Sequence, residues 1–222
     1  MSKLVWDLTG ERLYETGVKN GVLYPMTDAG TYDTGVAWNG LTAVTESPSG
    51  AEATALYADD MKYLNLYSAE ELGGTIEAYM YPPEFAKCNG EEDLVAGVTI
   101  GQQKRSAFGL CYRTVVGNDV SSNDYGYKLH LIYGAMASPS ERAYATVNDS
   151  PEAITFSWEF TTTPVAVEGF KPTSLVTIDS TKLDEAGKAK LAELETMLYG
   201  GDDAEPTLPL PSAIKALFDT QG

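Results

Sequence analysis

The clearest hydrophobic pattern in the chain lies in residues 153–163. Its even-numbered positions from Ile154 to Phe160 are aliphatic or aromatic, and the odd-numbered positions between them are Thr, Ser or Glu. A period of two residues is typical of an antiparallel β-strand with one buried face. Residues 74–81 alternate in the same way. Both segments are therefore predicted strands.

Shorter apolar runs bounded by turn residues predict further strands. They are residues 22–24, 36–38, 41–44, 54–57, 61–67, 108–116, 125–137 and 175–178. Asn39-Gly40 separates two of these runs and is the strongest short hairpin signal, so the strands on its two sides are expected to pair. A long hairpin that projects from the body is expected over residues 41–66.

The C-terminal part changes to a helical pattern. Leucines at 191, 194 and 198 form one apolar stripe, which predicts a helix over residues 182–199. Thr181 with Asp184 resembles a capping box at its start, and Gly200-Gly201 provides its end. Residues 212–218 predict a last short helix.

These elements predict a mainly β fold, an antiparallel β-sandwich or partly closed barrel with one flanking helix. Residues 1–20 lack a sustained period and are interpreted as an extended N-terminal arm. Residues 21–199 then form the β domain, and residues 200–222 form a C-terminal extension.

Charge narrows the possible functions. The 222 residues include 32 acidic and 15 basic side chains, which give a formal net charge of −17. Proteins that grip nucleic acid need a cationic surface, so this chain is expected to repel DNA. No apolar run approaches the roughly 20 residues of a membrane helix, and no secretory signal is evident. We therefore expect a cytoplasmic origin and free thiols at Cys88 and Cys111.

Motifs for catalysis are lacking. The chain has no GxSxG, GxxxxGK[ST] or GxGxxG motif. The one histidine, His130, could serve a Ser-His-Asp site or pair with Cys111, but an alternating strand position more often places a histidine on the exposed polar face. We expect no enzyme activity, no cofactor and no metal site, since a Cys/His zinc site needs about four ligands.

Two other patterns leave alternatives open. Glu77 and Glu159 lie on the polar faces of predicted strands, as a glycosidase pair would, although solvated sheet faces are the more common explanation. Several tyrosines could form a sugar-binding platform or a protein contact. They are Tyr79, Tyr81, Tyr127 and Tyr133.

Six motifs in order resemble the major tail proteins of long-tailed, non-contractile phages and prophages of Gram-positive bacteria. They are TGERLYETG (9–17), GVAWNG (35–40), GTIEAYMYP (74–82), YGYK (125–128), ATVNDS (145–150) and FSWEFTTTP (156–164). The resemblance covers about residues 7–199, and its specificity lies in the ordered combination. Residues 200–222 have no match in it.

The resemblance implies a tail tube subunit. Six copies would form a ring, and rings would stack into a tube around a tape measure protein, between terminator and initiator proteins. DNA would pass through the lumen without specific binding, and no membrane would be involved. The protein would belong to the virion tail and be assembled in the host bacterial cytoplasm.

Within this interpretation, three groups of residues are candidate sites. Glu77 and Glu159 are candidates for the lumen face. The candidate ring-to-ring hairpin covers residues 43–60, with Glu46, Pro48, Glu52, Tyr57 and Asp59. The candidate contacts of the N-terminal arm are Trp6, Leu13 and Tyr14. A carbohydrate-binding β-sandwich, a glycosidase and the tube subunit of a phage tail-like bacteriocin remain alternatives.

Overall fold

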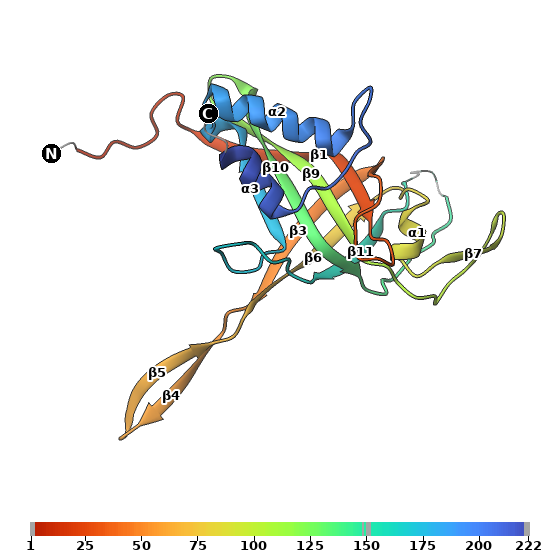
Figure 1. Ribbon diagram of the computed structural model, residues 1–222, viewed down its shortest axis with the longest axis horizontal. Helices are drawn as coiled ribbons and strands as arrows, with labels where there is room; N and C mark the ends of the chain where they lie inside the picture. The colour runs from red at the N-terminus through yellow and green to blue at the C-terminus, as the bar shows by residue number, and fades with distance from the viewer. Residues whose placement is uncertain (1–2, 148, 150–151, 220–222) are drawn as a thin grey trace.

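Eight antiparallel strands form one curved sheet in the computed structural model, which describes residues 3–147, 149 and 152–219 (Figure 1). The sheet order is β2-β1-β9-β10-β11-β6-β3, and β12 pairs with β10 beside β11. The strands are β1 (Leu13–Pro25), β2 (Val36–Ala37), β3 (Leu41–Gly50), β6 (Glu70–Ala78), β9 (Phe108–Asn118), β10 (Ser122–Ala137), β11 (Phe156–Thr162) and β12 (Leu175–Asp179). The mainly β, antiparallel class expected from the sequence is confirmed.

The two ends of this sheet meet at the Asn39-Gly40 turn. β2 pairs with β1 and β3 pairs with β6, so the hairpin expected between the two segments is wrong. The Trp38 N–H donates to the Gly21 carbonyl at 2.8 Å, and the Tyr79 N–H donates to the Gly40 carbonyl at 2.8 Å. Four residues reach about 14 Å at most, so the sheet has to curl to bring its first and last strands together.

The curled sheet encloses the larger of two apolar cores. Trp38, Phe85, Trp158 and Phe160 are almost fully buried there. The Trp158 ring meets the Phe85 ring edge-on at 5.1 Å between centroids. Phe85 is supplied by the short helix α1 (Phe85–Cys88). Within residues 153–163, Trp158 and Phe160 are buried as the alternation predicts, and Glu159 is exposed on the other side. The strand begins only at Phe156, however, and Ile154 is 38% exposed.

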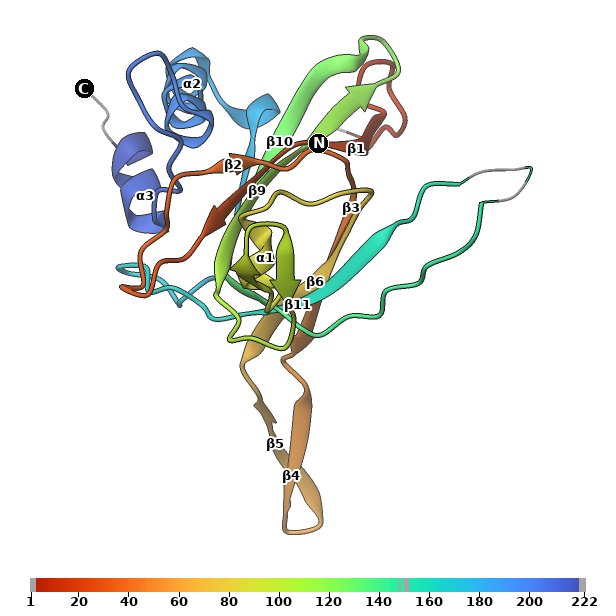
Figure 2. The same cartoon turned by 90° about the vertical axis from the view of Figure 1, so that its right-hand side faces the viewer.

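A second core lies on the outer face of β1, β9, β10 and β12, under the helices α2 (Glu185–Tyr199) and α3 (Pro211–Asp219) (Figure 2). The predicted leucine stripe is confirmed, because Leu191, Leu194 and Leu198 are buried against it. Ile214 of α3 is buried in the same core, and α3 lies where a last short helix was predicted over residues 212–218. The Tyr133 hydroxyl also donates to the Pro209 carbonyl at 2.9 Å.

The start of α2 differs from the predicted capping box. Asp184 is the N-cap, and its carboxylate accepts from the Gly187 N–H at 2.7 Å. Thr181 lies instead in a short 3₁₀ turn, η1 (Ser180–Lys182), where Asp179 accepts from its N–H at 3.0 Å. Asp179 therefore caps the 3₁₀ turn, and Asp184 caps α2. The sequence pattern does not show that two separate caps are present.

The first strand begins earlier than expected. Residues 13–20 were assigned to the arm, but they pair with β9 as part of β1. Bulges between Thr16 and Val18 and between Lys19 and Val22 break the alternation. Gly17 and Asn20 have φ values of 68° and 56°. Because of these interruptions, the strand shows no regular alternation in the sequence. The arm is therefore shorter than predicted and ends before Leu13.

Two small hairpins extend from the body. One is formed by β4 (Ala53–Ala58) and β5 (Met61–Tyr67), close to the predicted strands, and the other by β7 (Glu92–Val95) and β8 (Val98–Ile100). Parts of three sequence assignments lie outside the described residues: positions 1–2 of the arm, 148 and 150 of the 145–150 motif, and 220–222 of the extension.

Candidate assembly surfaces

The β4–β5 hairpin is the most projecting part of the molecule (Figures 1 and 2). It continues the β3–β6 ladder outward, through a Gly50-Ala51 step at which both residues have positive φ. Asp59 and Asp60, with φ of 49° and 61°, form its two-residue turn. Positive φ at both positions is the type I′ geometry that suits a twisted hairpin. This geometry holds the β4–β5 hairpin away from the body.

Both faces of this hairpin carry large hydrophobic side chains. One face places Leu56 opposite Leu64, next to Leu66, and these three are 39–54% exposed. Tyr57, Tyr63 and Tyr67 are 69–72% exposed. A two-stranded hairpin is marginally stable in water on its own, and a contiguous exposed apolar patch marks a contact surface. The hairpin thus has the properties of a docking element.

The hairpin residues selected from the sequence fall in three places. Glu52, Tyr57 and Asp59 lie on the exposed projecting part. Pro48 lies at its base, opposite Leu72 of β6. Glu46 belongs to β3, but its half-buried side chain takes part in a polar cluster inside the body. Sequence reasoning did not foresee this cluster.

The N-terminal arm, residues 3–12, is anchored only near its base. The Gly10 N–H donates to Asp119 at 2.9 Å, and the Asn118 side chain donates to the Gly10 carbonyl at 3.1 Å. Before this anchor, Trp6 is 74% exposed. Leu13 and Tyr14, which were grouped with the arm, lie in β1 and are exposed as well.

One half of the sheet has an uncovered outer face, since α2 and α3 cover only the other half (Figure 2). The register places Glu77 opposite Ser157 and Glu159 opposite Thr75, so both glutamates share this face as diagonal neighbours. Met136 of β10 is aligned with Thr161 at the border of this face. The aligned positions of β3, β6 and β11 on it are small, hydroxylated or acidic, with no Lys or Arg. They are Ala43, Thr45, Ser47, Gly73, Thr75, Glu77, Ser157, Glu159 and Thr161.

His130 is buried between two carboxylates, and its expected place on an exposed face is wrong. Its Nδ1 lies 3.4 Å from Glu46 Oε1, and its Nε2 lies 3.6 Å from Glu15 Oε1. The ring stacks on Tyr112 with 4.7 Å between centroids. Thr114 Oγ1 lies 3.0 Å from Nε2. Both faces of β10 are covered here, one by the helices and one by the opposite half of the sheet, so alternation did not separate buried from exposed positions.

The cluster lowers the pKa of both carboxyl groups. For Glu46, the interaction with His130 is the largest cause, burial opposes it, and the hydrogen bond from the Tyr112 hydroxyl adds to it. For Glu15, burial raises the pKa, but the hydrogen bonds from Lys128 and Thr114 outweigh it. Each group is therefore held in its charged form, so the cluster stabilises the fold most when its carboxylates are ionised.

Two constellations considered from the sequence are not brought together. Cys111 points into the helix-side core, whereas the adjacent Tyr112 points into the other core with His130, so Cys111 and His130 lie on opposite faces. The four tyrosines do not form a platform either. Tyr133 is buried under the helices and Tyr81 packs on Trp158, while Tyr127 lies under the Arg113 guanidinium and Tyr79 is exposed.

Within residues 3–147, 149 and 152–219, no group of three or more His, Cys, Asp or Glu side chains is placed to hold a metal ion. In the same part of the chain, no helix is long and apolar enough to cross a membrane. Cys88 and Cys111 are both buried and unpaired as disulfides.

No protein family model matches the chain, and no curated protein matches it. Among solved structures, it is similar to a chain from the "Cryo-EM structure of the anti-feeding prophage (AFP) baseplate, 6-fold symmetrised". The identity is 9%, the TM-score is 0.37, and the match covers 81% of this chain and 100% of that one. At this similarity the match assigns no function to the protein.

Proposed function

We propose that this protein is a structural subunit of a phage tail tube. The observation that carries the proposal is the β4–β5 hairpin, which projects a two-sided apolar surface that no other part of the described chain covers. An enzyme or a monomeric binding module has no evident need for such an element. In a tube, it would bury its leucines and tyrosines against a subunit of the adjacent ring. The ordered motifs of the sequence support the same assignment.

The sheet edge supports lateral association. Over its described residues β3 pairs only with β6, so the far edge of residues 45–50 is open. An open edge is a template for pairing with another chain. Six subunits arranged head to tail would close such contacts into a ring. The finer features, a hexamer and a stack of rings around a tape measure protein between terminator and initiator proteins, come from the resemblance.

The uncovered sheet face is our candidate for the lumen wall. A wall of small, hydroxylated and acidic side chains offers phosphates no cationic partner, so DNA could slide past it during ejection. The proposed location is the virion tail, with assembly in the host bacterial cytoplasm. The tube of a phage tail-like bacteriocin would use the same subunit without carrying DNA.

Negative-stain electron microscopy and light scattering over a concentration series test the proposal. We expect the wild-type protein to form rings or tubes with a central hole. The double variant Leu56→Ser, Leu64→Ser should keep its circular dichroism spectrum and its unfolding midpoint but lose stacked tubes. Leu94→Ser is the matched control, because Leu94 is an exposed leucine (65%) on the other hairpin.

Two outcomes would count against the proposal. Tubes that form equally well with the Leu56→Ser, Leu64→Ser variant would remove the hairpin from the ring contact. A monomer at all concentrations that also binds a glycan on an array would favour a carbohydrate-binding module. The four tyrosines considered for a sugar-binding platform are not brought together, which does not support that alternative.

A further inference from the structure

The second free edge of the sheet lies at β12. Its five residues pair with β10 on one side, and among the described residues no strand pairs with its other side. A groove of about 480 Å³ follows this edge. Its lining comes from both faces of the sheet: Thr177 and Lys128 from the inner face, and Ile178 from the helix-side core. A groove that wraps a strand edge in this way can receive another strand.

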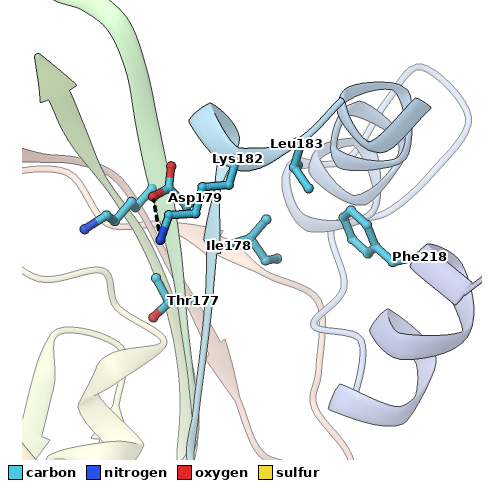
Figure 3. A pocket seen from close by; sticks show the side chains of 7 residues that line it. Thr177, Ile178, Asp179, Lys182, Leu183 and Phe218 are labelled. Carbon is cyan, nitrogen blue, oxygen red and sulfur yellow. Dashed lines mark ion pairs between the residues drawn. The ribbon is translucent and has the colours of Figure 1, made fainter. Parts of the chain in front are cut away.

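The side chains of the groove divide into two kinds. Ile178, Leu183 and Phe218 form an apolar part, and Figure 3 shows them facing one another across it. Lys128, Lys182 and Asp179 form the polar rim, where Lys182 Nζ lies 3.8 Å from Asp179 Oδ2. Lys128 is already paired with Glu15, whereas the Lys182 side chain is 80% exposed, so Lys182 is the lysine of this rim that a further carboxylate can reach.

The N-terminal arm has the complementary chemistry. Leu4, Val5 and Trp6 are 73%, 63% and 74% exposed. Leu4 and Trp6 fall on the same side of an extended segment, and Asp7 adds a carboxylate directly after them. Asp7 has a φ of 56°, so the segment able to add as a strand is residues 3–6, comparable in length to β12. Figure 1 shows the arm leaving the body and running away from it.

We infer that residues 3–6 of one subunit add as a strand to the β12 edge of a second copy, with Trp6 in the apolar part of the groove. Main-chain hydrogen bonds would provide affinity and the Trp6 anchor would provide specificity, as in other cases of strand addition. The Asp7 carboxylate would meet Lys182, the exposed lysine of the rim. This inference rests on the proposed function, which brings copies of the chain together, and it identifies the surface that receives the arm.

Disulfide cross-linking in the full-length protein tests it. One sample carries Asp7→Cys and a second carries Lys182→Cys. They are mixed over a concentration series, oxidised mildly, and analysed on non-reducing gels. The native cysteines are buried and should not compete. Lys188→Cys is the matched control, because Lys188 also pairs with an acidic residue three positions away but lies on α2 outside the groove.

We expect several-fold more heterodimer with Lys182→Cys than with Lys188→Cys, and a loss of this excess when Trp6→Ala is added to the Asp7→Cys chain. Equal yields at the two lysine positions would overturn the inference. So would a disulfide formed only within one chain carrying both Asp7→Cys and Lys182→Cys, since the arm would then occupy its own groove.

The same gels separate this inference from the proposed function. Tubes seen by microscopy without the specific cross-link would leave the tube subunit intact and remove the arm from the β12 edge. A specific cross-link in samples that form neither rings nor tubes would keep the arm contact and count against the tube.

Discussion

The Nδ1 atom of His130 lies 3.4 Å from Glu46 Oε1, inside the body and at the foot of the projecting hairpin. The same imidazole faces Glu15, which lies in β1 a few residues after the N-terminal arm. One side chain on β10 therefore contacts the strands that carry both candidate assembly elements. The strand at the hairpin base and the strand that follows the arm therefore meet at one polar cluster.

Acid should weaken the fold through this cluster. The pKa of Glu46 is below its ordinary value of 4.5 in the folded protein, chiefly because of His130. A carboxyl group with a lowered folded pKa stabilises the fold above its unfolded pKa, and this stabilisation is lost as the pH falls through the folded value. We expect the free energy of unfolding of the wild type to fall steeply below pH 4.5.

Urea unfolding at several pH values measures this effect. The Glu46→Gln variant should lose about 1 kcal/mol at neutral pH and show a shallower acid dependence than the wild type. Glu52→Gln, on the exposed hairpin, is the control and should keep the wild-type pH profile. Parallel profiles for Glu46→Gln and the wild type would contradict a stabilising role for the Glu46 carboxylate.

Gly74 should not tolerate a side chain. A Cβ atom at this position would lie 2.1 Å from the Thr45 carbonyl oxygen and 2.7 Å from Phe160 Cζ. Overpacking of this kind costs about 1–3 kcal/mol. Gly74→Ala should therefore lower the free energy of unfolding by an amount of about this size or more. Gly101→Ala is the control, because a Cβ there meets nothing within 4 Å. Equal stability of the two variants would contradict this prediction, because it would show that β3 and β11 can shift away from a side chain at position 74 with no loss of stability.

The two cysteines should be inert in the native protein. Burial raises the pKa of both the Cys88 and the Cys111 thiol to about 12, and the thiolate is the reactive form. We expect no reaction with a thiol reagent at pH 8 in buffer and two reactive thiols per chain in denaturant. Rapid reaction of one thiol under native conditions would indicate local opening of the core around it.

The uncovered sheet face can be tested for a role in DNA passage. Under the proposed function, virions that carry Glu77→Lys and Glu159→Lys should assemble but eject DNA more slowly, because a cationic wall attracts phosphates. Asp202→Lys with Asp203→Lys is the control with the same change in charge on an exposed loop. Normal ejection by the Glu77→Lys, Glu159→Lys virions would refute the lumen assignment.

Local pattern was sufficient for much of the fold. The alternation of residues 153–163 placed Trp158 and Phe160 in the core and left Glu159 outside. The leucine stripe identified the buried side of α2. Each of these predictions compares positions within one segment, where the period of a strand or helix determines which side chains point the same way. The shared face of Glu77 and Glu159, in contrast, needed the register between β6 and β11.

By itself the sequence determined the types of most elements, though not the β7–β8 hairpin. It also determined the excess of acidic charge and the strand-forming segments that lead to the projecting hairpin. Only the tertiary structure decided that the strands on either side of Asn39-Gly40 pair with other partners, that bulged residues 13–20 join the sheet, and that His130 is buried. The physical reason is that partner choice and burial depend on elements distant in the chain. Both faces of β10 are covered by such elements, so a period of two residues does not distinguish an inner polar residue from an outer one.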